Sequence, residues 1–215
     1  MKARFWAGVP KVPAKEKKKM KIYTCFIQHV LNSLKENGKG AIVLPTGFLT
    51  AKSGVEGKLL EHIVDKHIVY GVISMPSNVF ANTGTNVSVV FFDNSKQADK
   101  VILIDASKLG EEYQEGNNKK VRLTDDEIDL IVDTFLSKKE TEDFSVVVTY
   151  ADIIAKKNSL AAGQYFDVKI EYIELTQDEF NQKMLCYSAE LDKYFAESNA
   201  LQKEIKKQLG KVKYE

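Results

Sequence analysis

The chain has 215 residues, of which 44% are hydrophobic and 28% charged, and its formal net charge at pH 7 is +1. This length and composition allow a sizeable buried core, so we expect a globular protein with one domain plus an appendage, or two small domains. A net charge this small excludes a strong overall attraction to nucleic acid. Any such contact must come from a local patch or from a partner subunit.

The sequence contains no apolar run near the length of about 18 residues that a membrane span needs. Residues 1–20 are basic and lack the apolar segment of a signal peptide. We therefore expect a soluble, cytoplasmic protein. Cys25 and Cys186 lie far apart within helical patterns, and we interpret both as reduced, small hydrophobic residues.

Residues 1–20 are predicted to form a loop or arm, because they contain two prolines, an aromatic pair and a run of lysines. The lysines are typical of a solvated linker, and the alternative is a segment that contacts phosphates. A helix is expected next, ending near Asn37 and Gly38. Its apolar face would consist of Ile22, Phe26, Ile27, Val30, Leu31 and Leu34.

Residues 40–93 are predicted to form a strand, a helix, a second strand, a loop and a third strand. The run from Ala41 to Leu44 is continuously apolar and ends at Pro45, which is typical of a strand covered on both faces. Ser53 is a candidate N-cap for the helix. Segments 68–74 and 86–92 are rich in β-branched and aromatic residues, which favours strands.

Beyond residue 95 the pattern predicts a strand at 101–104, a mobile loop at 110–120, a strand at 144–148 and a short helix at 150–156. Between the loop and the second strand, Thr124 and Glu127 form a capping-box pattern that opens another helix. The buried side of that helix would consist of Ile128, Ile131, Val132 and Phe135.

A long helix is predicted over residues 177–209, with Thr176 and Glu179 as its capping box. It would span roughly 50 Å. Its apolar residues alternate by four and three positions, the spacing of a coiled-coil seam. The seam consists of Phe180, Met184, Tyr187, Leu191, Tyr194, Ser198, Leu201 and Ile205. Such a helix either packs on its own domain or meets another chain, and the sequence alone leaves both open.

A search for catalytic or metal-binding patterns identifies no catalytic residue and no metal ligand. The histidines, His29, His62 and His67, are not spaced to share one helical turn. The sequence Gly38-Lys39-Gly40 resembles the start of a dinucleotide-binding loop, but it precedes a strand, whereas that loop must follow one. We interpret it as a turn.

Several short motifs, taken in order, resemble the modification subunit of type I restriction-modification systems. These enzymes are adenine-N6 DNA methyltransferases that use S-adenosylmethionine. The resemblance covers nearly the whole chain. It rests on Phe26-Ile27-Gln28-His29, residues 40–49, Glu56-Gly57-Lys58, residues 75–80, Thr83-Gly84-Thr85-Asn86 and Ile104-Asp105-Ala106-Ser107, with Arg4-Phe5 and Gly8-Val9 near the start.

The resemblance implies an α/β fold: part of a Rossmann-like S-adenosylmethionine methyltransferase sheet, a small α/β extension and a long carboxyl-terminal coiled-coil-like helix. Segments 41–45, 68–74 and 86–92 would correspond to the fifth, sixth and seventh strands, the last one antiparallel. The expected domains are an arm at 1–20, the carboxyl-terminal part of the catalytic domain at 21–95, the extension at 96–170 and an assembly helix at 171–215.

The chain departs from the family in two motifs. The glycine-rich cofactor loop after the first strand and the Asn-Pro-Pro-Tyr/Phe motif after the fourth are both missing from the sequence. By analogy the chain corresponds to the carboxyl-terminal half of the family's chain. We therefore expect S-adenosylmethionine to serve the complete enzyme, no cofactor on this chain alone, and no methylation by this chain alone.

The resemblance also suggests which residues hold the target adenine, which such enzymes rotate out of the duplex. Phe80 would stack on the base, with Asn82 and Thr83 following it at the pocket rim. Pro45, Thr46 and Phe48 would lie at the carboxyl end of the fifth strand. The alternative interpretation is structural: Phe80 as a hydrophobic plug, and the other three as strand termination and core filling.

Expected partners are DNA, the specificity subunit, and the amino-terminal methylase half or a full modification subunit. The specificity subunit would dock on Phe180, Met184, Tyr187, Leu191, Tyr194, Leu201 and Ile205. Apolar surface left exposed on strand 41–45 and its flanking helix would favour partner binding or self-association. The alternative function is a non-catalytic assembly or regulatory module, or a degenerate remnant, that binds the specificity subunit.

Overall fold

The structure is a computed structural model that describes residues 4–80, 84–95, 99–116, 118–166 and 176–211. The chain divides into two compact units, residues 1–167 and 168–215. The first unit is an α/β body, and the second contains one helix, α5 (Gln177–Leu209). Among the described residues, no helix has both the length and the apolar character needed to cross a membrane.

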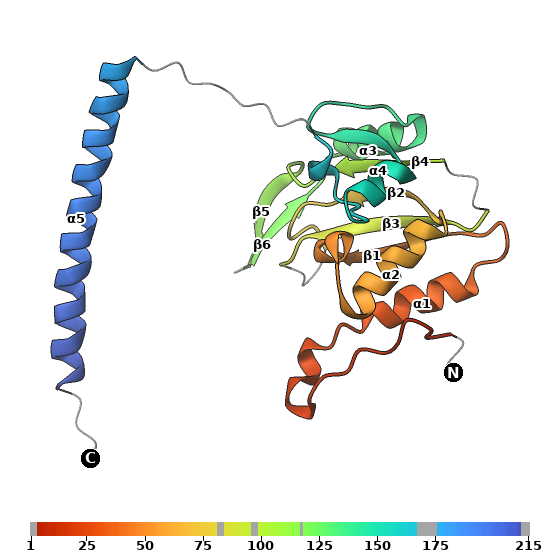
Figure 1. Cartoon of the computed structure of the whole chain (residues 1–215), viewed down its shortest axis with the longest axis horizontal. Helices are drawn as coiled ribbons and strands as arrows, with labels where there is room; N and C mark the ends of the chain where they lie inside the picture. Colours follow the sequence, from red (N-terminus) through yellow and green to blue (C-terminus); the bar gives the residue numbers. More distant parts are fainter. Residues whose placement is uncertain (1–3, 81–83, 96–98, 117, 167–175, 212–215) are drawn as a thin grey trace. The chain divides into compact units, whose positions relative to one another are not determined.

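A five-stranded mixed sheet forms the centre of the first unit (Figure 1). Its order is β1-β3-β2-β4-β7, and β3 pairs antiparallel with both β1 and β2. Because β2 pairs parallel with β4, the strands β1, β2 and β4 all run in one direction. The strands are β1 (Lys39–Pro45), β2 (Val69–Ser74), β3 (Val87–Asp93), β4 (Lys100–Asp105) and β7 (Ser145–Thr149).

Helices cover both faces of this sheet, and each face has its own core. On one face α1 (Tyr23–Ser33), α2 (Gly54–Asp65), α4 (Tyr150–Ala155) and the 3-10 turn η2 (Thr46–Thr50) share the larger core. On the other, α3 (Asp125–Ser137) packs over the smaller core. Strand β4 serves both, because its successive side chains alternate between the two cores.

A glycine in the central strand β2 lets α3 approach the sheet. A Cβ atom on Gly71 would lie 2.3 Å from the ring of Phe135 on α3, far inside van der Waals contact. Only glycine fits beneath this ring without a shift of the helix.

The prediction of a mobile loop at 110–120 was wrong. These residues form a two-stranded antiparallel hairpin, β5 (Glu111–Glu115) and β6 (Asn118–Arg122). In the hairpin Glu111 lies opposite Arg122, and Lys119 forms an ion pair of 3.6 Å with Glu112. Every residue of β5 is exposed, so the strand carries no apolar alternation for sequence analysis to detect.

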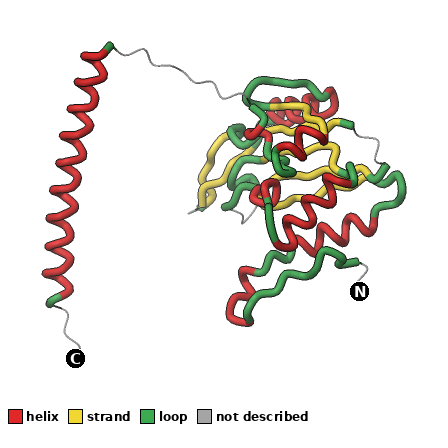
Figure 2. The backbone as a smooth tube through the Cα atoms, viewed as in Figure 1, coloured by secondary structure: helices red, strands yellow, loops and turns green. Residues whose placement is uncertain are grey.

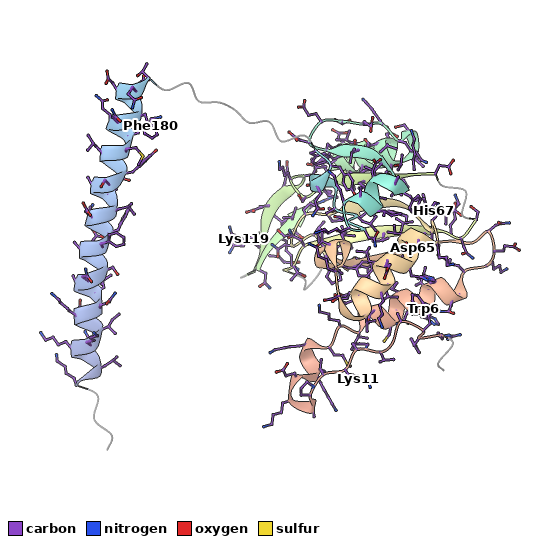
Figure 3. The ribbon with its side chains drawn as sticks, in the orientation of Figure 1. Trp6, Lys11, Asp65, His67, Lys119 and Phe180 are labelled. Carbon is purple, nitrogen blue, oxygen red and sulfur yellow. The ribbon has the colours of Figure 1, made fainter. Side chains whose placement is uncertain are left out.

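The amino-terminal segment folds back on α1 and changes the face that this helix buries. The Gln28 side chain accepts a hydrogen bond from the Ala7 amide and donates one to the Gly8 carbonyl, each at 2.9 Å. The Trp6 ring lies 4.1 Å from the His62 ring, centroid to centroid (Figure 3). The 3-10 helix η1 (Ala14–Lys19) follows this segment.

Two predicted helix faces were therefore only partly right. In α1 the buried residues are Thr24, Ile27 and Gln28, whereas Ile22, at the N-cap, and Phe26 are exposed. In α3 Ile131 is buried, but Ile128 and Val132 are exposed. Apolar spacing identified the helices, but the faces depend on tertiary contacts.

Strand β1 lies at the edge of the sheet, and the prediction of a strand covered on both faces was wrong because one of its faces is exposed. Leu44 is fully buried, while Ala41 and Val43 are exposed on the other face, Val43 by 46%. The expectation of exposed apolar surface on this strand and its flanking helix is confirmed, since Phe26 of α1 is 58% exposed.

Capping boxes open three helices. The predicted boxes Thr124/Glu127 and Thr176/Glu179 are confirmed at α3 and α5, and a third occurs at Thr149 and Asp152 before α4. The predicted cap Ser53 occupies the N-cap position of α2, but its side chain makes no capping hydrogen bond.

Helix α4 is anchored to the sheet through its first residue. The Tyr150 hydroxyl donates a hydrogen bond to the Val69 carbonyl of β2, and its ring stacks on His67 at 4.0 Å. Burial raises the pKa of Tyr150 above its ordinary value. The 3-10 turn η3 (Ala162–Gln164) follows α4, and Leu160 between them donates its amide to the Leu49 carbonyl at 2.9 Å.

The capping box of α3 predicts a pH-dependent contribution to stability. Hydrogen bonds from the Gly110 and Thr124 amides hold the pKa of Glu127 below its ordinary value. The stability they provide is therefore present above that ordinary pKa and is lost as the pH falls through the lower, folded-state pKa. We expect Glu127→Gln to lower the free energy of unfolding near pH 7 and to match the wild type more closely near pH 3.

Urea unfolding at both pH values measures this difference. Glu36→Gln, which removes an exposed carboxyl outside any capping box, serves as the control. A difference between Glu127→Gln and wild type that is equally large at the two pH values would contradict the prediction.

Candidate functional site

The candidate site lies where the three parallel strands end. Pro45, Ser74 and Asp105 are the last residues of β1, β2 and β4, and the first residue of β3, Val87, pairs with Pro45. Figure 2 shows these strands side by side in one sheet. Because the strands run in one direction, their carboxyl ends meet at one edge, the usual place for ligands in open α/β sheets.

Three hydroxyl groups from three chain segments form a row at this edge. The Thr46 Oγ1 and Ser88 Oγ atoms lie 2.9 Å apart, and Ser88 Oγ donates to Ser74 Oγ at 3.3 Å. Ser88 is fully buried, whereas Thr46 and Ser74 are half-buried. A buried hydroxyl thus fixes the orientation of two hydroxyls that reach the surface.

Of these three residues, only Thr46 was predicted from the sequence; Ser74 and Ser88 were not. The available signal was a polar residue within each of two apolar strands, Val-Ile-Ser-Met and Val-Ser-Val-Val. That signal is weak, since serine is common at strand ends. Only the pairing of β3 with both β1 and β2 places the two serines beside Thr46.

The other two proposed residues near β1 have different environments. Pro45 is exposed at the end of the strand, next to Thr46, whose amide donates to the Asn86 carbonyl at 3.1 Å. Phe48 is fully buried and packs edge-on against Tyr23, with ring centroids 6.3 Å apart. In this structure Phe48 is a core side chain.

Phe80 follows β2 and is 38% exposed. Two residues earlier, Asn78 adopts a left-handed conformation with φ of 60°, which asparagine tolerates better than most residues. The Asn78 carbonyl accepts a hydrogen bond of 3.2 Å from the Val121 amide of β6. The hairpin therefore supports the segment that carries Phe80. Asn82 and Thr83 lie outside the described residues.

The hairpin carries positively and negatively charged side chains beside this segment. Lys119 projects from β6 (Figure 3) and is paired with Glu112. On β5 the Tyr113 ring is 47% exposed. At the end of β4 the Asp105 carboxylate accepts a hydrogen bond of 3.0 Å from the Ser107 amide and so closes its own turn. Within the described residues, no three His, Cys, Asp or Glu side chains gather as metal ligands would.

The apolar seam predicted on the last helix is present on α5, which has no buried residue. Its members Phe180, Met184, Tyr187, Leu191, Tyr194, Leu201 and Ile205 are each 50–60% exposed. Figure 3 labels Phe180 near the start of the helix. A helix of 33 residues with an exposed apolar stripe along its length is typical of a helix that pairs with another.

Type I restriction enzyme methylase subunits are among the known proteins that this chain resembles. The N-6 DNA methylase family model matches residues 2–172. The MjaIX type I restriction enzyme methylase subunit of Methanocaldococcus jannaschii is 31% identical over 192 residues, which cover 84% of this chain and 33% of that protein. The HindI type I methylase subunit of Haemophilus influenzae is 30% identical over 88% of this chain and 43% of its own length.

A solved structure agrees with these relatives. The type I restriction-modification methyltransferase subunit of Streptococcus thermophilus is 28% identical, with a TM-score of 0.61 over 69% of this chain and 31% of that chain. The present chain thus spans about a third to under a half of the length of the relatives it matches. By the match of its residues 2–172, it belongs to the N-6 DNA methylase family.

Proposed function

We propose that this chain is part of a type I adenine-N6 DNA methyltransferase, in which it supplies the target-base pocket and the helix that docks on the specificity subunit. The observation that carries the proposal is the strand arrangement β1-β3-β2, with β3 antiparallel between two parallel strands. By the family resemblance, β1, β2 and β3 would correspond to the fifth, sixth and seventh strands of the methyltransferase sheet, of which the seventh is antiparallel. The family match supports the same assignment.

The free edge of β1 is where further strands of the complete sheet would pair. One side of β1 pairs with β3, and β1 ends the strand order on the other side. The side chains of Ala41 and Val43 are exposed on one face of β1, so this face presents apolar surface. An edge of this kind readily pairs with a further strand. Since the relatives are two to three times as long, we assign this edge to the amino-terminal half of the methylase.

The complete enzyme would use S-adenosylmethionine, but the segment that follows β1 in this chain does not fit a glycine-rich cofactor loop. The segment after β1 folds into η2, with Phe48 and Leu49 fully buried. Its single glycine, Gly47, has open space where a Cβ would be, so no ligand cradle depends on it. The methyl donor and the Asn-Pro-Pro clamp on the adenine amino group would therefore come from the other half.

The role left to this chain is to receive the flipped base. Rotating the adenine out of the duplex exposes its ring, and an aromatic side chain stabilises it there by stacking. Phe80 is partly exposed on a segment held by the Asn78–Val121 hydrogen bond. Thr46 brings an oriented hydroxyl to the same edge of the sheet. Together they could provide a stacking face and a polar contact for the base.

We predict that Phe80→Ala lowers methyl transfer by the reassembled enzyme about 5- to 150-fold, the equivalent of a stacking energy of about 1–3 kcal/mol. The measurement is transfer of a labelled methyl group to DNA by this chain mixed with the amino-terminal half and the specificity subunit. Phe80→Trp, which keeps an aromatic face, should retain most of the activity.

Two results would count against this function. Equal activity of Phe80→Ala and wild type would contradict the assignment of Phe80 to the target-base pocket. Binding of the specificity subunit with no methyl transfer by the wild-type mixture would instead favour a non-catalytic assembly module.

Charges beside the α5 seam favour a different protein over a second copy of this chain. Lys183, Glu190, Glu197 and Glu204 recur every seven residues along one flank, so this flank is mainly acidic. Glu197 also lies 4.0 Å from Lys193 of its own helix. The opposite flank carries Ser188, Phe195 and Gln202, none of which is basic. In a parallel pair of α5 helices the glutamates would face no cation, whereas a partner helix with lysine or arginine on its facing flank would match them. We assign the seam to such a helix of the specificity subunit.

We predict that Leu191→Glu combined with Leu201→Glu abolishes binding of the specificity subunit, because each substitution buries a charge in the seam. Ala189→Glu combined with Ala196→Glu adds the same two negative charges on the opposite side of the helix and should leave the affinity within a few-fold of wild type. Isothermal titration of each purified variant with the specificity subunit gives the affinity. Equal loss in the two double variants would contradict a specific seam.

A further inference from the structure

A cavity of about 470 Å³ lies between the segment that enters α2 and the turn that follows α4. Lysines from both sides line it: Lys52 and Lys58 from the first segment and Lys157 from the turn. Within the described part of the chain, none of the three ammonium groups forms an ion pair or an interaction with an aromatic ring. One acid, Glu61, shares the lining, so the cavity carries an excess of positive charge.

The backbone holds these lysines in place. The two sides of the cavity are joined by the Leu160–Leu49 hydrogen bond. On the first side, a Cβ on Gly57 would lie 2.8 Å from the Lys52 carbonyl carbon, so glycine is what lets the Lys52 backbone pack on the first turn of α2. The cavity is thereby built from fixed elements, while the lysine side chains reach into solvent.

The neighbouring lysine shows what a structural lysine does in this fold. Lys156 donates to the Gln164 carbonyl and lies 4.4 Å from the centre of the Tyr165 ring. Lys157, the next residue, has no such partner within the described residues and lines the cavity instead. Lys156 thus interacts with groups of its own chain, whereas the charge of Lys157 is available to an anion outside the chain.

We infer that this cavity binds phosphate groups of the DNA backbone beside the target base. Its residues follow directly after β1 and η2, so it belongs to the same sheet edge as Thr46. The lysines carry the inference, and the beginning of α2 adds only a partial positive charge. The choice of DNA as the source of the phosphates rests on the proposed function.

The test uses the isolated full chain and a short duplex of G·C pairs, which contains no adenine and so leaves the base pocket empty. We expect the duplex to shift the amide NMR signals of residues 51–58 and 157–158. In the triple variant Lys52→Gln, Lys58→Gln, Lys157→Gln these shifts should vanish. In a plot of the logarithm of the binding constant against the logarithm of the salt concentration, the magnitude of the slope should also fall by about 2 to 3. Each phosphate contact contributes about 0.9 to this slope.

A matched variant controls for the change in charge. Lys35, Lys66 and Lys100 are exposed and lie at the opposite edge of the sheet. Lys35 precedes β1, Lys66 follows α2, and Lys100 is the first residue of β4. Asp65 and His67, which flank Lys66, mark that end of α2 (Figure 3). The triple variant Lys35→Gln, Lys66→Gln, Lys100→Gln should bind the duplex as wild type does. Equal loss in the two triple variants, or no shift at the cavity amides, would overturn the inference.

Inorganic phosphate is the second probe. If it produced the same shifts at the same concentration of phosphate groups as the duplex, the cavity would be a site for free anions and the assignment to DNA would be overturned. Methyl transfer by the reassembled enzyme is measured separately. Cavity shifts without methylation would contradict the proposed function and leave the phosphate site standing.

Discussion

The position of β3 between β1 and β2 is the constraint on which the rest of the structure depends. Each residue of β3 from Val87 to Asp93 has a partner on β1, and five have partners on β2. Because β3 runs against both neighbours, β1 and β2 must run in the same direction. Their carboxyl ends therefore meet, and Thr46, Ser88 and Ser74 come together there although they are far apart in the sequence.

The same sheet ends in two edge strands, β7 on one side and β1 on the other. At the far side β7 pairs with β4, and α4 is fixed to β2 by the hydrogen bond from Tyr150 to Val69. At the near side β1 has no further neighbour and exposes Val43. An edge strand with exposed apolar side chains at β1 is what a family member with a third to under a half of its relatives' length should show, if the remainder continues the sheet from β1.

Charge is placed differently on the two kinds of surface in this family member. Along α5, acidic residues flank an apolar seam, which suits a helical partner with basic flanks. Around the cavity near α2, lysines lack acidic partners within the described residues. A net charge of +1 for the whole chain hides both features, because local fields near a surface depend on the arrangement of charges and not on their sum.

The sequence by itself determined the helices, the apolar strands, the capping boxes at Thr124 and Thr176, and the family, because all of these depend on local spacing or on ordered motifs. Tertiary structure alone decided which side chains meet: Ser88 beside Thr46, Phe48 in the core, Phe26 exposed, and the hairpin of β5 and β6. These depend on strand order and on contacts between distant segments. A pattern of period two or 3.6 carries no information about either.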